Sequence, residues 1–372
     1  MRIALLTYST KPRGGVVHTL ALAEALARAG QDVTVWSLGR GGDAAFFRPV
    51  DPAVTVRLVP FPDLPDEDVG DRILRSIAVL GVAFAGSGEG CDVVHAQDCI
   101  SANAVPGCLR TVHHLDTFTT PALAACHDRA VSEPQALICV SAAVAAEVES
   151  GWGRRPAVIP NGVDAARFAA AAGPAGAAGR ARWRDRLGRF VLAVGGIEPR
   201  KGTLDLVEAM ALIRRTRPDL ALVVAGGETL FDYRDYRARV DSRAAELGVA
   251  PIVLGPVPHA DLPELVAAAE VFAFPSTKEG FGLAAMESLA AGVPLVVRDL
   301  PVLREVFDDA AAFATTPRGF AAELLAAAGG ADPGRLAAGR ALAARHTWDA
   351  AAAAHMDVYA RTRIAGQLTP ER

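Results

Sequence analysis

Residues 276–287 read Ser276-Thr277-Lys278-Glu279-Gly280-Phe281-Gly282-Leu283-Ala284-Ala285-Met286-Glu287, and they are the most informative part of the chain. They follow the apolar run Val271-Phe-Ala-Phe, which is typical of a buried strand. A loop with two glycines comes next, and the pattern then predicts a helix over residues 283–291. We therefore expect Glu279 in a loop at the carboxyl edge of a strand and Glu287 inside the following helix.

The spacing of Glu279 and Glu287 indicates how long a ligand that contacts both carboxylates would be. At about 1.5 Å per helical residue, Glu279 and Glu287 are expected on the order of 10 Å apart along the helix direction. That is roughly the length of a sugar–diphosphate–ribose, and the helix N-terminus between the acids has free N–H groups that suit a diphosphate. The alternative is that both acids are simply favoured by the helix dipole.

Length and composition narrow the class of protein. A chain of 372 residues is long enough for two domains, and 51% hydrophobic with 22% charged residues is typical of a globular protein. A net charge of −4 argues against a nucleic-acid-binding protein. The apolar stretch 77–85 is too short to span a bilayer, and no signal peptide is evident. We expect a soluble, cytoplasmic protein and leave a peripheral membrane contact open.

The cysteine pattern favours reduced, buried thiols over a metal site or a redox pair. The count is odd, and no C-x-x-C occurs. The five residues are Cys91, Cys99, Cys108, Cys126 and Cys139.

The first half of the chain alternates short apolar runs with helical patterns. Residues 3–8 form the first predicted strand, and a loop containing Gly14-Gly15 leads to a predicted helix over 18–29. Further strands are expected near residues 33–36, 54–59, 92–95, 110–113 and 136–140. Fully apolar strands separated by helices predict a parallel sheet that is covered on both faces.

The alternation breaks and then restarts. Residues 169–179 are almost only Ala, Gly and Pro, which indicates a linker. Strands are again expected at 190–194, 220–224, 252–255, 271–274 and 295–297. We predict two Rossmann-like domains over 1–168 and 186–346, a linker region over 169–185, and a final helix within 347–372. Ligands of such sheets bind at the carboxyl ends of the strands, so a cleft between the domains is expected.

Residues 276–287, continued by Gly292, Pro294 and Arg304-Glu305-Val306, resemble the signature of the family 4 retaining glycosyltransferases. The resemblance implies the GT-B fold, an α/β architecture in which two Rossmann-like parallel-sheet domains face a central cleft. It also implies that the last helix returns to the first domain. In this reading Glu279 contacts the donor sugar and Glu287 holds the ribose. The donor-binding residues between them would be Gly280, Phe281, Gly282 and Leu283.

The segment from Gly195 to Gly202 is similar to the basic donor loop of that family. Lys201 matches the family lysine that binds the diphosphate, where a cation is needed because charge builds on the leaving group. Many relatives carry an arginine where this chain has Gly196, and Arg200 is the candidate to supply the missing charge. The segment around Val257 is similar to the one that holds the nucleobase through backbone groups.

The first domain carries further matches to the family. Gly14-Gly15 looks like its opening glycine loop, which lets backbone amides approach the donor phosphates or the acceptor. His113 follows a strand and fits the family histidine close to the donor sugar. His18 opens a predicted helix, and we expect it at the surface. The acceptor-side candidates are His95, His114 and Asp116.

The resemblance implies a metal-independent reaction with no cofactor, in which a hexosyl group leaves a UDP- or GDP-type sugar with retention by front-face displacement. The acceptor, whether lipid, glycan or small metabolite, is left open. Asp66-Glu67-Asp68 spells D-x-D, a metal-binding motif of another glycosyltransferase fold. Here it lies in a proline-flanked acidic loop, which favours a solvated turn.

Three other functions stay open at this point. A sugar-nucleotide epimerase of the same fold would bind the same donor without an acceptor. A non-catalytic nucleotide-sugar binder would share the motifs. This function stays open because the chain has Gly196 where many members of the family have an arginine. An NAD-dependent oxidoreductase is disfavoured because the first strand is not followed by G-x-G-x-x-G. The Ala- and Arg-rich composition hints at a GC-rich bacterial genome.

Overall fold

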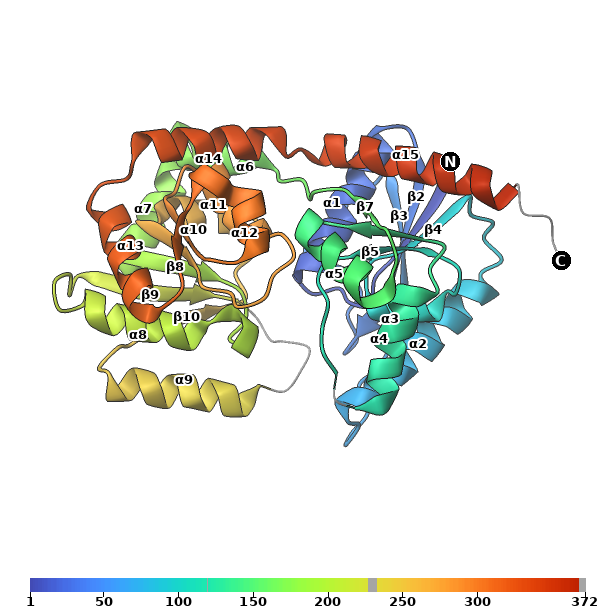
Figure 1. The fold of residues 1–372 in the computed structure, drawn as a ribbon, viewed down its shortest axis with the longest axis horizontal. Helices are drawn as coiled ribbons and strands as arrows, with labels where there is room; N and C mark the ends of the chain where they lie inside the picture. Colours follow the sequence, from blue (N-terminus) through green and yellow to red (C-terminus); the bar gives the residue numbers. More distant parts are fainter. Residues whose placement is uncertain (119, 227–232, 368–372) are drawn as a thin grey trace. The chain divides into compact units, whose positions relative to one another are not determined.

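The computed structural model describes residues 1–118, 120–226 and 233–367, and only the backbone of residues 363–367 (Figure 1). The chain divides into two compact units. The first contains Met1–Gly162 together with the chain from Trp348 onward, and the second contains Val163–Thr347. Each unit is built on one parallel sheet, as the alternation of apolar runs predicted.

The sheet of the first unit has seven strands in the order β3-β2-β1-β4-β5-β6-β7 (Figure 1). Neighbouring strands are parallel; for example, Arg2 of β1 is level with Asp32 of β2. The strands are β1 (Arg2–Leu6), β2 (Asp32–Arg40), β3 (Val54–Phe61), β4 (Val93–Ala96), β5 (Leu109–Val112), β6 (Ala136–Cys139) and β7 (Ala157–Val158).

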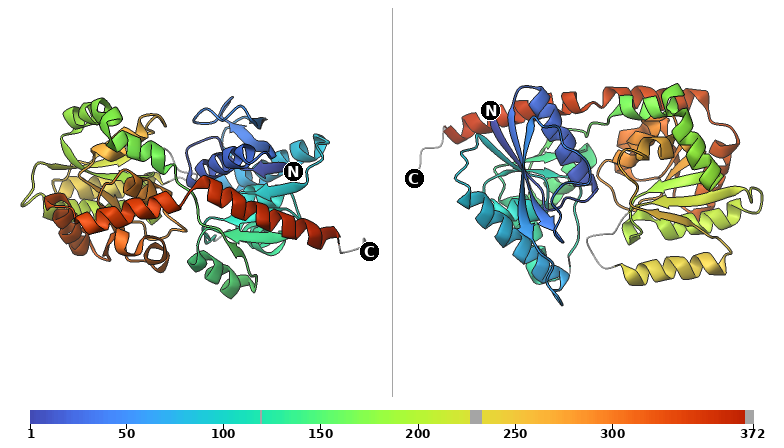
Figure 2. Two further views of the ribbon diagram at one scale, coloured as in Figure 1. Left: turned by 90° about the horizontal axis from the view of Figure 1, so that it is seen from above. Right: turned by 180° about the vertical axis from the view of Figure 1, so that it is seen from behind.

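Helices cover both faces of this sheet because successive strand side chains point to opposite faces. Ile3 and Leu5 of β1 pack in the core shared with helices α1 and α15, which lie side by side (Figure 2). Ala4 and Leu6 pack on the other face, under α2. The helices are α1 (Gly14–Arg28), α2 (Val69–Gly86), α3 (Cys99–Ala104), α4 (Pro121–Ser132), α5 (Ala142–Trp152) and α15 (Trp348–Gln367).

Helix α1 begins at Gly14, one turn earlier than the sequence pattern predicted. His18 therefore lies inside the helix on its buried side and is 1% exposed, so the prediction of a surface position was wrong. Its Nδ1 is 2.9 Å from Oδ1 of Asn161, so the imidazole has a polar partner inside the unit. A histidine next to a predicted helix start gives no periodicity from which burial could be judged.

The sheet of the second unit has six parallel strands in the order β10-β9-β8-β11-β12-β13 (Figure 1). The strands are β8 (Arg189–Val194), β9 (Leu220–Ala225), β10 (Ile252–Gly255), β11 (Val271–Phe274), β12 (Leu295–Arg298) and β13 (Ala312–Ala314). Val191, Val271 and Val296 of the central strands are fully buried against helices α8 and α13.

Twelve helical segments of the second unit fall within the described ranges. The α-helices are α6 (Ala165–Ala172), α7 (Ala177–Leu187), α8 (Thr203–Ile213), α9 (Arg234–Glu246), α10 (Leu262–Ala268), α11 (Leu283–Ala290), α12 (Pro301–Phe307), α13 (Pro317–Gly329) and α14 (Pro333–Arg345). The 3₁₀ segments are η1 (Pro174–Gly176), η2 (Pro199–Lys201) and η3 (Asp308–Ala310).

The segment predicted as a linker, 169–185, is helical. It contains the second half of α6, all of η1 and most of α7, and helices α6 and α7 pack against α10. Alanine is the strongest helix former, so an Ala-rich stretch becomes ordered once Phe168, which is 1% exposed, anchors it to a core. The division between the units accordingly lies at Gly162, ahead of the predicted boundary at residue 168.

Two further features of the described chain are the state of its cysteines and the character of its helices. All five cysteines are free, with Cys108, Cys126 and Cys139 buried as predicted and Cys91 and Cys99 partly exposed. Among the helices within residues 1–118, 120–226 and 233–367, none is long and apolar enough to cross a membrane.

Candidate active site

The loop between β11 and α11 places Glu279 at the carboxyl edge of the second sheet, as the sequence predicted. The loop ends at Gly282, whose φ of 97° suits glycine. A Cβ there would lie 3.1 Å from the ring of Phe307, so a side chain would also crowd the core. Gly280 is buried and Phe281 is 3% exposed, which anchors both sides of the turn.

The loop between β8 and α8 lies directly against this turn. Gly202 has a φ of 65°, and a Cβ on it would overlap the carbonyl oxygen of Pro275. The backbone N–H of Thr277 donates to the carbonyl of Arg200 across 2.7 Å. Glycine is thus required after Lys201 because the two loops approach each other closely.

This approach brings together Lys201, Arg200 and Glu279, three residues that the sequence assigned to the reaction. Nζ of Lys201 lies 2.5 Å from Oε1 of Glu279, and Nη1 of Arg200 lies 3.5 Å from the same oxygen. The side chains of Glu279 and Lys201 are 11% and 18% exposed. Arg200 also pairs with Glu198 across 2.7 Å, so this guanidinium is shared between two carboxylates.

Two opposed effects set the charge of Glu279. Burial raises the pKa of its carboxyl, but the positive charges of Lys201 and Arg200 outweigh burial and hold the pKa below its ordinary value. Glu279 is therefore ionised at neutral pH, and it accepts hydrogen bonds. Gly196 offers no side chain, yet two cations reach the carboxylate from the same loop.

Glu287 occupies a different environment, one helical turn and more along α11. Desolvation raises the pKa of its carboxyl to about 7, although Arg167 opposes the rise. Arg167, on α6, also binds His259, with Nη1 2.7 Å from the ring Nε2 and Nη2 donating to the carbonyl oxygen. His259 comes two residues after Val257. Through Arg167, helix α6 therefore contacts the segment predicted to hold the nucleobase and acts on Glu287, which is predicted to hold the ribose.

Sequence reasoning missed Arg167. It belongs to the segment Asn161-Gly162-Val163-Asp164-Ala-Ala-Arg167, which lies just ahead of the predicted linker region and contains none of the predicted site residues. The available signal was the aspartate ahead of a helix, because Asp164 caps α6 through the N–H of Arg167 and so fixes where that side chain emerges.

In the first unit, His113 lies against the glycine loop. A Cβ on Gly15 would be 3.5 Å from Cδ2 of His113, and the rings of His113 and His18 meet edge to face at 4.7 Å. Nε2 of His113 is buried and has no hydrogen-bond partner within the described residues. Burial lowers the pKa of His113 to about 3, so the imidazole is neutral. Gly14 begins α1 beside this contact and is exposed.

The three acceptor-side candidates do not share one environment. His95 is fully buried, with Nδ1 2.7 Å from the Tyr359 hydroxyl and Nε2 2.8 Å from that of Thr111. Both ring nitrogens are engaged inside the core, so placing His95 on the acceptor side was wrong. His114 and Asp116 are partly exposed and lie 3.3 Å apart, and their acceptor role stays a prediction.

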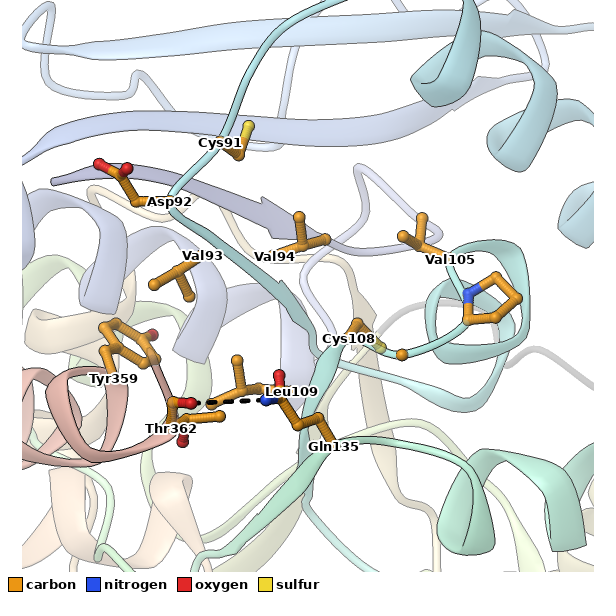
Figure 3. A pocket seen from close by; sticks show the side chains of 12 residues that line it. Cys91, Asp92, Val93, Val94, Val105, Cys108, Leu109, Gln135, Tyr359 and Thr362 are labelled. Carbon is orange, nitrogen blue, oxygen red and sulfur yellow. Dashed lines mark hydrogen bonds between the residues drawn. The ribbon is translucent and has the colours of Figure 1, made fainter. Parts of the chain in front are cut away.

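A cavity of about 280 Å³ lies at the other edge of the first sheet (Figure 3). It is lined where β4 and β5 begin and by α15, and Gln135 Nε2 donates to the carbonyl oxygen of Thr362 beside it. None of the predicted site residues lines this cavity. We place the candidate site at the opposite edges, because ligands of parallel sheets bind where strands end.

The described residues contain no group of three or more His, Cys, Asp or Glu side chains arranged to hold a metal ion. In the D-x-D stretch, Asp68 caps α2 and Glu67 pairs with Arg75 across 2.5 Å.

Both halves of the chain match known families. Residues 12–167 match the family described as Glycosyltransferase Family 4, and residues 184–328 match the family described as Glycosyl transferases group 1. Two named relatives extend over almost the whole chain. D-inositol 3-phosphate glycosyltransferase of Xylanimonas cellulosilytica is 32% identical over 97% of this chain and 96% of its own length. A glycogen synthase of Mycobacterium tuberculosis is 30% identical over 96% of this chain and 94% of its own length.

Solved structures share the fold at low sequence identity. Sucrose-phosphate synthase from Thermosynechococcus elongatus superposes with a TM-score of 0.77 at 20% identity, covering 98% of this chain and all of that one. WaaG, a glycosyltransferase of lipopolysaccharide biosynthesis, has a TM-score of 0.74 at 17% identity over 96% of this chain and 99% of its own. The predicted two-domain GT-B architecture is thus confirmed, and the chain belongs to the group 1 glycosyltransferases of family 4 and is an enzyme of that class.

Proposed function

We propose that this enzyme moves a hexosyl group from a nucleoside-diphosphate sugar to an acceptor with retention of configuration. The observation that carries the proposal is the cluster of Lys201, Arg200 and Glu279 at the carboxyl edge of the second sheet. Two cations and one ionised carboxylate are held there by close loop packing before any substrate binds. Preorganised charges of this kind stabilise charge that develops in a transition state.

The chemistry assigned to the cluster follows from its charges. As the bond between the anomeric carbon and the diphosphate oxygen breaks, Lys201 and Arg200 offset the negative charge that builds on that oxygen. Glu279 accepts hydrogen bonds from sugar hydroxyls and orients the sugar. The acceptor hydroxyl forms the new bond on the same face, and its proton passes to the departing diphosphate oxygen. This route needs neither a metal nor a cofactor.

The nucleoside is assigned to the far end of α11. An ionised Glu287 accepts hydrogen bonds from two ribose hydroxyls, and backbone groups near Val257 hold the base. Arg167 favours the ionised form of Glu287 and binds the loop that carries His259. His113, neutral and with a buried, unpaired Nε2 in the described part of the first unit, is assigned to a sugar hydroxyl.

The names of similar proteins support the donor class. A UDP-glucose complex of HepE from Anabaena has a TM-score of 0.74 at 20% identity over 96% of this chain and 100% of its own. The relatives named as D-inositol 3-phosphate glycosyltransferase and glycogen synthase are likewise glycosyl-transferring enzymes by name. We propose a UDP- or GDP-type donor on this basis.

Thermal denaturation with a panel of nucleoside diphosphates and their sugars, with and without magnesium, tests the donor. A ligand that binds only the folded state raises the melting temperature by mass action. We expect one base to give a clear rise without magnesium, and Glu287→Gln to reduce that rise. Glu270→Gln is the matched control, because Glu270 pairs with Arg189 at the other end of β11. No response to any nucleotide contradicts the proposal.

The reaction itself is tested once the base is known. The configuration of the product at the anomeric carbon, read by NMR, must match that of the donor. Conversion of the donor sugar without any acceptor would indicate an epimerase instead, and an inverted product would overturn the retaining mechanism.

A further inference from the structure

A second cluster of arginines lies in the first unit, at the carboxyl edge of its sheet. Tyr8 follows β1, Arg40 is the last residue of β2, and Arg13 immediately precedes α1. The guanidinium carbon of Arg13 lies 5.7 Å from the centroid of the Tyr8 ring, and that of Arg40 lies 5.3 Å from it. Two guanidinium groups therefore share one aromatic ring where strands β1 and β2 end.

A third arginine adds its charge to this group. Burial lowers the pKa of Arg40, and the positive charges of Arg72, on α2, and of Arg13 lower it further. Like charges that gather at one place disfavour one another unless a counter-charge is present. We call Arg13, Arg40 and Arg72, together with Tyr8, the tyrosine–arginine cluster.

The acidic groups that act on the cluster are Asp98 and Glu67, and both are engaged elsewhere: Glu67 also acts on Arg40 and Arg72, but it pairs with Arg75 across 2.5 Å. Asp98, the carboxylate that acts on both Tyr8 and Arg40, accepts from the backbone N–H groups of Tyr8 and Ser101 and caps α3. Burial raises the pKa of Asp98, and its hydrogen bonds to Ser101 and Tyr8 oppose that rise. Asp43 pairs with Lys11 across 3.1 Å. The cluster thus carries an excess of positive charge.

Hydrogen-bonding capacity in the cluster is also left over. Arg40 donates from Nη2 to the hydroxyl of Ser76 across 2.8 Å. The buried Nε atoms of Arg13 and Arg40 have no acceptor anywhere in the described part of the chain. Buried N–H groups are normally paired, so these atoms indicate a ligand that supplies acceptor oxygens.

Arg75 shows what a purely structural arginine looks like in the same region. Its guanidinium carbon lies 3.8 Å from the centroid of the Phe61 ring, and Glu67 pairs with its Nε across 2.5 Å. Arg75 therefore stacks on an aromatic ring as Arg40 does, but its charge is neutralised by a carboxylate. Packing on an aromatic ring alone does not explain why Arg13 and Arg40 lack such a partner.

We propose that the tyrosine–arginine cluster binds a phosphate monoester group of the acceptor. A guanidinium presents two parallel N–H groups to phosphate oxygens, and a phosphate dianion matches the excess positive charge. The inference rests on the proposed function, because the diphosphate of the donor is assigned to Lys201 and Arg200 in the second unit. The acceptor would thus be a phosphorylated molecule, either a soluble metabolite or a lipid with a phosphate headgroup.

The test measures binding in the whole protein carrying Lys201→Ala, so that the donor site does not capture phosphate. The soluble probes are inorganic phosphate and glucose 6-phosphate, with glucose as the uncharged control, in isothermal titration calorimetry. The lipid probe is a phosphatidylcholine vesicle doped with phosphatidic acid, compared with phosphatidylcholine alone in a sedimentation assay. These two arms distinguish a soluble from a lipid source of the phosphate.

We expect Arg40→Gln and Arg72→Gln each to weaken binding of the phosphate probe at least about tenfold, and Arg40→Lys to restore part of it. Arg57→Gln is the matched control, because Arg57 pairs with Glu89 across 3.1 Å, and it should change the affinity less than about twofold. Melting temperatures show whether each variant is folded, and Arg13→Gln replaces any variant that is not. Equal losses in Arg57→Gln, or no binding of any phosphate probe, overturn the proposal.

Failure of this inference and failure of the donor assignment give different results. Nucleoside-diphosphate binding is measured in a protein with an intact Lys201 and depends on the second unit. If the phosphate probe does not bind but the nucleotide does, only the role proposed for the tyrosine–arginine cluster is contradicted. If the nucleotide does not bind but the phosphate probe does, only the donor assignment is contradicted.

Discussion

Lys201 and Glu279 are 78 positions apart in the chain, yet Nζ of one lies 2.5 Å from Oε1 of the other. The contact joins the loops that follow β8 and β11, which are neighbours in the sheet although they are not consecutive strands. Neighbouring parallel strands bring their carboxyl ends to one edge, and Gly202 lets the loops touch there. The ion pair between Lys201 and Glu279 therefore forms because β8 and β11 are neighbours in the sheet, although they are not consecutive in the chain.

We expect Lys201→Ala and Glu279→Ala each to lower turnover at least about tenfold while the protein stays folded. Each change removes a charge that the proposed reaction uses: Lys201→Ala leaves Glu279 with Arg200 as its one remaining cation, and Glu279→Ala removes the carboxylate that pairs with Lys201. Steady-state kinetics with circular dichroism as the folding check measures this. Full activity in both variants, with the control Glu270→Gln also active, would contradict the roles assigned to Lys201 and Glu279.

The nucleotide affinity should depend on the ionisation of Glu287. The pKa of this carboxyl is raised to about 7 in the folded protein, so the acid is mostly protonated at pH 6 and mostly ionised at pH 8. Since ribose hydroxyls donate to a carboxylate, affinity should rise across this range. Calorimetric titration of the nucleoside diphosphate at several pH values tests it. Glu287→Gln should flatten the profile, and a wild-type affinity that does not change with pH contradicts the ribose role.

The same raised pKa also has a consequence for stability. Between the ordinary carboxyl pKa and about 7, the folded state binds more protons than the unfolded state, so Glu287 destabilises the fold increasingly as pH rises. Glu287→Gln should therefore melt higher than the wild type at pH 8 and not at pH 5. Differential scanning calorimetry at both values measures the difference, and a gain of equal size at both would contradict the ionisation.

The first unit should lose stability in mild acid because it buries neutral histidines. Burial lowers the pKa of His355 to about 4 and that of His113 to about 3, and it lowers those of His18 and His95 well below the ordinary value. The unfolded chain then binds more protons than the folded one below about pH 6.5. The stabilisation is complete above that pH and is lost as pH falls toward 4 and 3.

Each such histidine contributes a slope of at most about 1.4 kcal/mol per pH unit below pH 6.5. Urea unfolding at about pH 7.5, 6.5, 5.5 and 4.5 gives this slope directly, because these values span the window in steps of about one unit. His355→Gln should make the slope shallower, whereas the half-exposed His114→Gln should not. An identical slope in all three proteins would rule out the histidines as its source.

Glycine at position 202 should be needed for space as well as for its backbone conformation. Gly202 and Gly248 have φ values of 65° and 66°, but a Cβ would meet the carbonyl of Pro275 only at position 202 and nothing within 4 Å at position 248. Gly248→Ala should cost about 1–2 kcal/mol from the left-handed conformation alone. Gly202→Ala should cost more and also lower turnover, because it separates Lys201 from Glu279.

Thermal melting and kinetics of the two alanine variants, side by side, measure the difference. If both lose the same stability and both keep full turnover, the close approach of the two loops has no role in the site.

Much of this architecture was predictable because glycine, proline and uninterrupted apolar runs report local structure. Gly282 and Gly202 marked the turns that carry Glu279 and Lys201, and the run at 271–274 marked a strand buried on both faces. The linker prediction over 169–185 failed because composition does not show whether an Ala-rich stretch has a core to pack on. The burial of His18 and His95 depends on α15, which is far away in the sequence.

The parts of the site that the sequence did not reveal are those assembled from separate elements. Arg167 acts near Glu287 only because α6 packs beside α11, and no local pattern around residue 167 contains that contact. Arg13 and Arg40 likewise meet at Tyr8 because β1 and β2 are adjacent and end at the same edge. Ordinary arginines at the ends of strands and helices look like surface residues in a sequence.

The helix α15 has a consequence for how the protein is made. The second unit is one continuous stretch, 163–347, whereas the first needs residues from both ends of the chain. During synthesis the ribosome releases the partner of His95, Tyr359, only after the whole second unit has emerged. The unit translated first is therefore the unit completed last, and premature termination between residues 347 and 358 spares the second unit while leaving the first without part of its core.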